Sequence, residues 1–128
     1  MQEQLCTFDY ATIRLVPRVE REEFFNVGVI LSCPAHKFLD ARIFLNEAKL
    51  KCFAPGTEAE TVRHYLDIIP KICAGDAGAG LIGKLPQRER FYWLTAQRST
   101  IIQSSPVHTG LTGDPGKMLE HLFEKMVR

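Results

Sequence analysis

Alternating apolar and polar residues predict three β-strands in the first third of the chain, over residues 7–16, 25–33 and 38–45. An alternation with a period of two places successive side chains on opposite faces of a sheet. Pro17 ends the first strand, and the tight loop at 34–37 joins the second strand to the third as a hairpin. On the second strand, the side chains expected to face the core are Phe25, Val27, Val29 and Leu31.

Helical spacing predominates in the rest of the chain. Asn46 can cap a short helix that ends at residue 53. Thr57 and Glu60 have the spacing of a capping box, which predicts an amphipathic helix over 57–73. The remaining predicted elements are a helix over 86–94, a strand over 99–104, a loop over 105–113 and a final helix capped by Asp114.

These elements predict a single α+β domain over residues 1–128. Three early strands without intervening helices indicate a mainly antiparallel sheet of about four strands, with helices packed on one face. Residues 75–80 are rich in glycine and are expected to form a flexible loop, which marks no domain boundary. A chain of this length can bury enough surface to fold without a metal or a disulfide.

Composition and charge narrow the classes of function. Hydrophobic residues make up 45% and charged residues 24%, and 16 Lys and Arg nearly balance 15 Asp and Glu. This balance argues against a protein that coats nucleic acid or an anionic membrane. The apolar run at 27–31 is too short to cross a bilayer, and residues 1–4 lack the features of a signal peptide. We therefore expect a cytoplasmic protein that does not contact membranes.

The four cysteines give no sign of a metal or redox site. They are isolated in the sequence and none belongs to a C-x-x-C pair, which zinc and redox motifs require. We expect reduced, mostly buried thiols, no metal and no cofactor. The residues concerned are Cys6, Cys33, Cys52 and Cys73.

A first group of polar residues surrounds the connection between the first two strands. If these strands pair, Arg14 and Asn26 share the face opposite the core, where a guanidinium beside a carboxamide can clamp an anion or an amide. Alternatively, this face is exposed to solvent and Arg14 pairs with Glu20 or Glu23. Arg18 belongs to the same group.

A second group interleaves basic and aromatic residues over 88–93 and continues to Arg98. Such a pattern can bind single-stranded nucleic acid or a phosphorylated ligand. The alternative is that Phe91, Trp93 and Leu94 belong to the core. Nucleic-acid binding is the less favoured interpretation, because the chain lacks the usual excess of positive charge.

A third group lies in the predicted loop after the fourth strand. Ser105, His108 and Thr109 place hydroxyls and an imidazole next to the turn at Pro106, and loops at strand ends often carry sites. His108 is a weak candidate for a general acid or base. No G-x-S-x-G motif precedes it, and the alternative is a turn whose hydroxyls satisfy backbone groups.

Two segments, 10–29 and 90–111, give the chain a family resemblance. Together they resemble the bacterial family catalogued as domain of unknown function 3037, and the likeness covers nearly the whole chain. The family has no settled activity. Its signature residues correspond here to Arg14, Pro17, Arg18, Glu20, Glu23, Asn26, Gly28, Arg90, Trp93, Arg98, Ser99, Gln103, Ser105, Pro106, His108, Thr109 and Gly110.

The resemblance implies a context, because members of this family are often encoded beside a kinase similar to the HipA toxin kinases. The first hypothesis is therefore a non-catalytic interaction module, the accessory partner of such a kinase in a bacterial toxin–antitoxin-like or defence pair. It would bind through the second face of the sheet or through the loop after Gln103.

Two further hypotheses use the same residues differently. A small enzyme or ligand-binding domain for a phosphorylated or nucleotide substrate would hold the anion with Arg14, Arg18 and Arg98. His108 would move a proton, and Ser99 and Ser105 would contribute hydrogen bonds. Binding of single-stranded nucleic acid is the third hypothesis. The candidate binding residues common to these hypotheses are Arg14, Arg18, Glu20, Glu23, Asn26, Arg90, Arg98, Ser99, Gln103, Ser105, His108 and Thr109.

Overall fold

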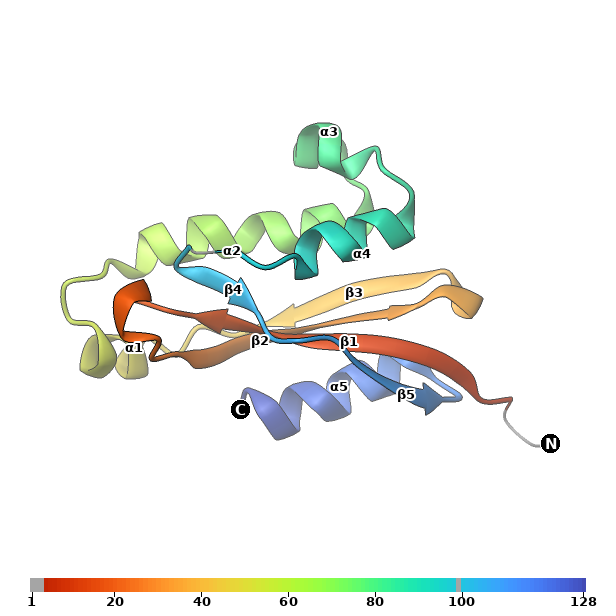
Figure 1. Ribbon diagram of the computed structural model, residues 1–128, viewed down its shortest axis with the longest axis horizontal. Helices are drawn as coiled ribbons and strands as arrows, with labels where there is room; N and C mark the ends of the chain where they lie inside the picture. The colour runs from red at the N-terminus through yellow and green to blue at the C-terminus, as the bar shows by residue number, and fades with distance from the viewer. Residues whose placement is uncertain (1–3, 99) are drawn as a thin grey trace.

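An antiparallel sheet forms the centre of the molecule, with helices above and below it (Figure 1). The structure, a computed structural model, describes residues 4–98 and 100–128. The strands are β1 (Cys6–Leu15), β2 (Phe25–Cys33), β3 (Phe38–Ile43), β4 (Ile102–Ser104) and β5 (His108–Thr112). The helices are α1 (Glu47–Phe53), α2 (Ala59–Ala74), α3 (Gly80–Gly83), α4 (Gln87–Thr95) and α5 (Pro115–Met126), with short 3-10 turns η1 (Val19–Arg21), η2 (Pro34–His36) and η3 (Ala77–Ala79). The α+β class is confirmed.

The order of strands in the sheet is β3-β2-β1-β4, and β5 also pairs with β1. β4 and β5 thus follow one another along the same side of β1, with residues 105–107 between them. The register places Arg14 opposite Asn26 on β2 and opposite Gln103 on β4. It also places Tyr10 opposite His108 on β5.

Helices cover both faces of the sheet, which differs from the expectation of helices on one face (Figure 1). α2 and α4 lie on what we call the first face, and α5 packs on the second face. Leu119 and Leu122 of α5 belong to a cluster with Val29 and Leu31 of β2. The expectation is therefore wrong for α5, because β2 is buried on both faces and needs cover on each.

A β-bulge in β2 explains why its apolar residues serve two cores. Between Ile13 and Arg14 the register shifts by one residue, which leaves Val27 as the extra residue. A bulge reverses the alternation of faces beyond it. Phe25, Val27 and Ile30 accordingly join the first-face core, whereas Val29, Leu31 and Cys33 join the second-face core. The expectation of one shared core face is wrong.

Gly28 is required at the bulge by a close backbone approach. A Cβ atom there would lie 2.8 Å from the backbone oxygen of Arg42 on β3. Only glycine lets the two strands come this close without a shift of the backbone.

Two predicted helix caps are confirmed, and one is wrong. The side chain of Asn46 accepts a hydrogen bond from the Lys49 amide (3.0 Å), and Asp114 accepts one from the Lys117 amide (3.1 Å). The capping box before α2 does not form, because Glu58 takes the N-cap position without a side-chain bond.

Two segments expected as loops contain regular structure. Part of the glycine-rich stretch 75–80 forms η3 and the start of α3, which projects from the helical layer (Figure 1). The segment expected as a loop over 105–113 contains β5, whose strand geometry depends on pairing with β1 rather than on its own composition. The strand expected over 99–104 is shorter, as β4, and Ser99 lies outside the described residues.

Within the described part of the chain, no helix combines the length and apolar character needed to cross a membrane.

Candidate functional site

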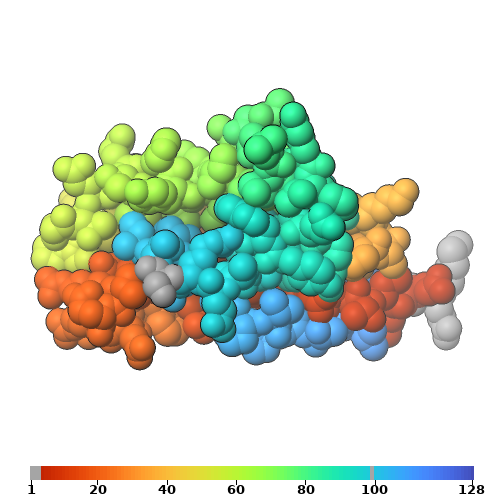
Figure 2. All heavy atoms as spheres, turned by 45° about the horizontal axis from the view of Figure 1, so that its top comes forward, coloured from red at the N-terminus to blue at the C-terminus, as the bar shows by residue number. Residues whose placement is uncertain are grey.

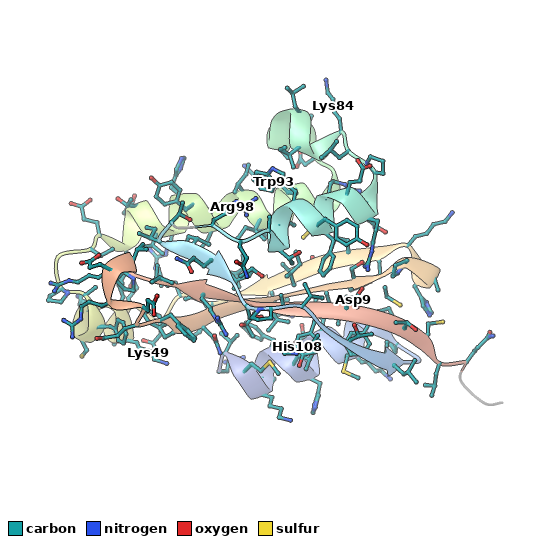
Figure 3. All side chains as sticks on the ribbon, in the orientation of Figure 1. Asp9, Lys49, Lys84, Trp93, Arg98 and His108 are labelled. Carbon is teal, nitrogen blue, oxygen red and sulfur yellow. The ribbon has the colours of Figure 1, made fainter. Side chains whose placement is uncertain are left out.

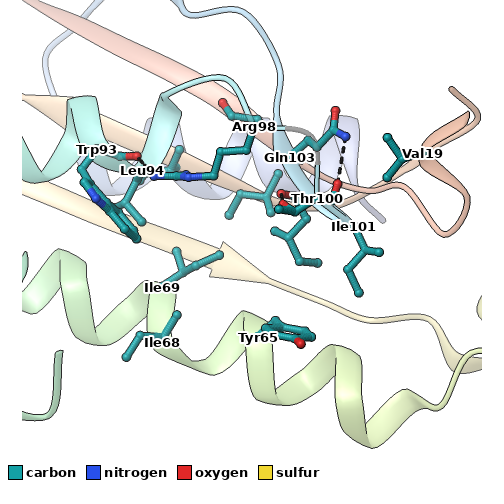
Figure 4. A pocket seen from close by; sticks show the side chains of 14 residues that line it. Val19, Tyr65, Ile68, Ile69, Trp93, Leu94, Arg98, Thr100, Ile101 and Gln103 are labelled. Carbon is teal, nitrogen blue, oxygen red and sulfur yellow. Dashed lines mark hydrogen bonds between the residues drawn. The ribbon is translucent and has the colours of Figure 1, made fainter. Parts of the chain in front are cut away.

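A cavity of about 510 Å³ opens on the first face between α2, α4 and the β4 segment (Figure 4). Ile13 and Ile30 of the sheet are almost completely buried and form its floor. Tyr65 and Ile69 of α2 line one side. The opposite side is formed by the end of α4 and the chain that leads into β4, through Trp93, Leu94, Arg98, Ile101 and Ile102.

The cavity lining is apolar apart from a few polar groups and one cation. Arg98 is the cation, and the polar side chains include Thr100 and Gln103. Gln103 donates a hydrogen bond to the backbone oxygen of Thr100 (2.8 Å), which fixes its amide near the opening. Among the described lining residues there is no carboxylate, imidazole or thiol. An apolar lining with a few polar groups is typical of a small-molecule binding site.

Arg98 is held in place by Trp93. Its guanidinium carbon lies 4.2 Å from the centre of the indole ring, and it donates a hydrogen bond to the backbone oxygen of Trp93. Stacking on an aromatic ring leaves the edge of a guanidinium able to donate further hydrogen bonds. Figure 3 shows both side chains on the first face of the sheet, beside α2 and α4.

The aromatic residues of the basic run have separate positions. Phe91 is fully buried in the first-face core, as the alternative interpretation predicts. Trp93 is 39% exposed and Leu94 is partly buried, and both line the cavity. The run is therefore part core and part cavity wall.

An ion pair between Arg88 and Asp9 joins α4 to the sheet beside Phe91. Arg88 bonds Asp9, donates to Ser32 Oγ (2.9 Å) and donates to the Tyr92 hydroxyl (3.1 Å). The Thr109 hydroxyl donates to the other oxygen of Asp9 (2.6 Å). This network connects β1, β2, β5 and α4.

The network lowers the pKa of Asp9. Burial alone would raise the pKa, but the hydrogen bonds from Thr109 and Arg88 and the positive charge of Arg88 outweigh it. Sequence reasoning did not single out Asp9. The signal was its position two residues before the buried Ala11, on the core side of β1, where an acidic residue needs a partner.

Arg90 closes the C-terminal end of α2. Its Nη1 donates to the backbone oxygens of Ile72 and Cys73 (2.8 Å each), and its Nε donates to that of Leu85 (3.0 Å). A guanidinium satisfies the free carbonyls that every helix leaves at this end. The geometry gives this candidate residue a structural role.

Arg14 and Asn26 meet on the second face, as strand parity predicts. Asn26 Nδ2 donates to the backbone oxygen of Met126 at the end of α5 (3.1 Å), and the Arg14 guanidinium lies 4.1 Å from the centre of the Phe24 ring. Arg14 Nε and Asn26 Oδ1 are buried and have no hydrogen-bond partner among the described residues. The alternative pairing of Arg14 with Glu20 or Glu23 is not seen, since Glu23 pairs with Arg21 (2.8 Å).

The other acidic and basic candidates of this group lie on the turn between β1 and β2. Arg18, Glu20 and Glu23 are exposed. Arg18 and Glu23 line a smaller hollow of about 110 Å³ together with Arg21. The hollow contains charges of both signs and does not join Arg14 to Arg98.

The candidates that follow β4 do not form a catalytic pair, and two of them, His108 and Thr109, lie in β5 rather than in the expected loop. Ser105 is buried, and its Oγ accepts the Thr12 amide (2.9 Å) and donates to the backbone oxygen of Pro106 (2.9 Å). The His108 ring lies 5.3 Å from the Tyr10 ring and is bonded to no described hydroxyl or carboxylate. The Thr109 hydroxyl donates its hydrogen bond to Asp9. The sequence candidates therefore occupy several places, and Arg98 and Gln103 line the cavity.

A comparison with protein families identifies the family of this chain. The chain matches the family described as "Protein of unknown function (DUF3037)" over residues 10–127. It belongs to this family. No curated protein and no solved structure matches it. The match runs from β1 through α5, so it includes every element that forms the cavity.

The cysteines of the DUF3037 domain are unpaired, and two of them are buried. Cys33 and Cys73 are buried, Cys6 is half-buried and Cys52 is exposed. Burial raises the pKa of the Cys33 thiol and raises the pKa of Cys73 to about 12. Both buried thiols therefore stay protonated and unreactive at neutral pH.

β4 and β5 form one edge of the sheet in this DUF3037 domain. Figure 2 shows residues around β4 lying between the turn after β1 (orange) and α4 (teal). Val107 and Leu111 are 44% and 60% exposed along this edge. Residues 99–113 include no Lys, Arg, Asp or Glu, in a chain that is 24% charged. We call residues 102–112 the uncharged edge.

Proposed function

We propose that this DUF3037 domain is a non-catalytic interaction module that binds a protein partner along the uncharged edge. The observation that carries the proposal is an exposed edge strand, β5, without a charged residue. The N–H and C=O groups on the outer side of an edge strand can pair with another chain. Charged side chains, especially lysine, are one of the devices by which natural proteins prevent such pairing.

The geometry of the edge fits the addition of a strand from a partner. β5 uses its inner side to pair with β1 over five registered positions, from Cys6 to Tyr10. A partner strand on the outer side would gain backbone hydrogen bonds, and alternate side chains would supply specificity. Leu111 and Val107 are the exposed apolar contacts available there.

The chemistry of the described residues supports binding rather than catalysis. The described lining of the cavity includes no carboxylate or imidazole that could act as a general base, and Ser105 directs its hydroxyl to the backbone oxygen of Pro106 and not to His108. Two arginines of the basic run are engaged inside the fold and offer little to a nucleic acid. Arg88 pairs with Asp9, and Arg90 bonds backbone oxygens of α2.

The partner proposed first is a kinase similar to the HipA toxin kinases, as the family resemblance implies. In this proposal the domain is the accessory subunit of a toxin–antitoxin-like or defence pair in the bacterial cytoplasm. What supports it is the family context together with the uncharged edge.

Co-expression with a kinase similar to the HipA toxin kinases tests the proposal, followed by size-exclusion chromatography with mass measurement. We expect a stable complex with the wild type and its loss with Leu111→Lys, because a lysine blocks strand addition at an edge. The matched control is Leu81→Lys, which introduces the same charge at an exposed leucine of α3, away from β5 (Figure 1). The control is expected to retain the complex.

Three results would contradict the proposal. Absence of a complex with the wild type removes the kinase as partner. A complex that survives Leu111→Lys places the interface elsewhere. A homodimer that Leu111→Lys dissociates assigns the edge to a second copy of the chain.

A further inference from the structure

The geometry of the first-face cavity points to a small ligand, and we propose that the cavity binds an amphipathic monocarboxylate. The apolar body would occupy the space between α2 and the sheet, and the carboxylate would bind Arg98 at the opening. This inference is independent of the proposed partner, because the uncharged edge and the cavity use different residues apart from the β4 segment itself.

The size and lining of the cavity suit an apolar body. Its volume of about 510 Å³ lies within the range of roughly 300–1,000 Å³ that is usual for small-molecule sites. Ile13 and Ile30 make an apolar floor, and Ile68 and Ile69 make an apolar wall. Such a surface favours hydrocarbon over water.

Arg98 supplies charge complementarity for an anionic head group. No carboxylate lies within ion-pair distance of Arg98 among the residues that the structure describes, although Arg21, Arg42, Arg63 and Arg88 each have one. The stack on Trp93 holds the guanidinium at the cavity. A carboxylate accepts two parallel hydrogen bonds from a guanidinium, and such charge-assisted bonds are the strong ones.

The balance of charge favours a monoanion over a phosphate. Arg98 is the one cation among the described residues of the lining, so it can neutralise a single negative charge. A phosphate monoester carries nearly two charges at neutral pH. Thr100 and Gln103 offer polar atoms at the same opening.

The single tryptophan makes the proposal directly testable. The chain has one Trp, and this residue, Trp93, lines the cavity. Decanoate is the probe, and decanol is the control of equal chain length without the charge. We expect decanoate to cause a saturable change in tryptophan fluorescence and to bind about tenfold or more tighter than decanol.

Variants of Arg98 distinguish the contribution of the ligand's carboxylate to binding from that of its apolar body. Calorimetry is the readout, because substitution of Arg98 changes the surroundings of Trp93 itself. We expect Arg98→Gln to weaken decanoate binding about tenfold or more and to leave decanol binding unchanged, and Arg98→Lys to restore part of the preference. The control is Arg63→Gln, on α2 but paired with Glu47 outside the cavity, which is expected to bind decanoate like the wild type.

Any of three results overturns the proposal. The first is equal affinity of the wild type for decanoate and decanol. The second is an Arg98→Gln variant that folds and keeps the preference for decanoate, since the head group then does not bind Arg98. The third is no saturable binding of either probe to the wild type. None of these results bears on the kinase complex, which is measured without the probes.

Discussion

Replacing Phe91 with alanine is expected to lower the free energy of unfolding by about 3–5 kcal/mol. Phe91 is the largest of the fully buried side chains and is completely inaccessible to solvent. It joins α4 to the first-face core, which includes Ile13, Ile30 and Leu66. Its removal deletes this contact and leaves a cavity that the neighbouring side chains fill only in part.

Urea unfolding of Phe91→Ala and of the wild type measures this loss. The control is Tyr92→Ala on the same helix, because Tyr92 is 56% exposed and its hydroxyl accepts a single hydrogen bond among the described residues, from Arg88. We expect the control to lose about 1 kcal/mol. Equal losses in the two variants would show that α4 is not fastened to the sheet through Phe91.

Replacing Arg88 with methionine is expected to cost about 2–3 kcal/mol. The change leaves the Asp9 carboxylate, only 14% exposed, without its cation, and it removes a donor from Ser32 and Tyr92. The Arg88 side chain is 35% exposed, so the cost lies below that of a fully buried pair. Methionine keeps much of the apolar volume, so the loss reports on the charge.

A double-mutant cycle with Asp9→Asn isolates this pair. We expect the two single losses to sum to more than the loss of the double variant, because the residues act on one another. The control is Arg42→Met, which removes an exposed ion pair with Glu120 on the second face and should cost about 1 kcal/mol or less. Additive losses at Asp9 and Arg88 would contradict the network.

The lowered pKa of Asp9 gives the same network a pH dependence. A carboxyl whose pKa is lower in the folded state than its ordinary value of 3.8 stabilises the fold fully above that value. The contribution is lost as the pH falls through the lowered pKa. We expect the stability difference between the wild type and Asp9→Asn to be constant near neutral pH and to shrink below about pH 4. A difference that does not change in acid would contradict the assignment.

The packing of Phe91 and the Arg88 network both fix α4 to the sheet, and α4 carries part of the cavity wall. Phe91 and Arg88 face the sheet, whereas Trp93 and Arg98 at the end of the same helix and just beyond it face the cavity. The position of Arg98, the proposed carboxylate contact, therefore depends on the contacts that Phe91 and Arg88 make earlier in α4.

Strand alternation and helix caps were predictable because they depend on neighbours in the chain. The period of two predicted β1, β2 and β3, and the side chains of Asn46 and Asp114 capped the helices that the sequence assigned to them. The meeting of Arg14 with Asn26 was also predictable, since it required only that adjacent strands pair. Local geometry sufficed in each case.

The cavity was not predictable, because its residues come from distant segments. Ile13, Tyr65, Trp93 and Arg98 acquire a common function only when α2 and α4 pack over β1 and β4. In the sequence, the local pattern of strands and helices already accounts for each of these residues, so none of them indicates a cavity. The partner of Asp9 was hidden for the same reason, since Arg88 lies 79 positions away.

Local patterns in the chain thus determine the α+β class, most strand and helix positions and the family. Long-range packing decides that α5 covers the second face, that residues 108–112 form an edge strand, and that Arg98 faces an apolar cavity. The physical reason is one of range. Apolar periodicity and helix capping involve residues a few positions apart, whereas a bulge, a sheet edge and a cavity are formed by elements that are distant in the sequence. Residues 105–113, which are rich in Ser, Thr, Gly and Pro, have only a weak preference for strand conformation. Pairing with β1 therefore determines that residues 108–112 form β5.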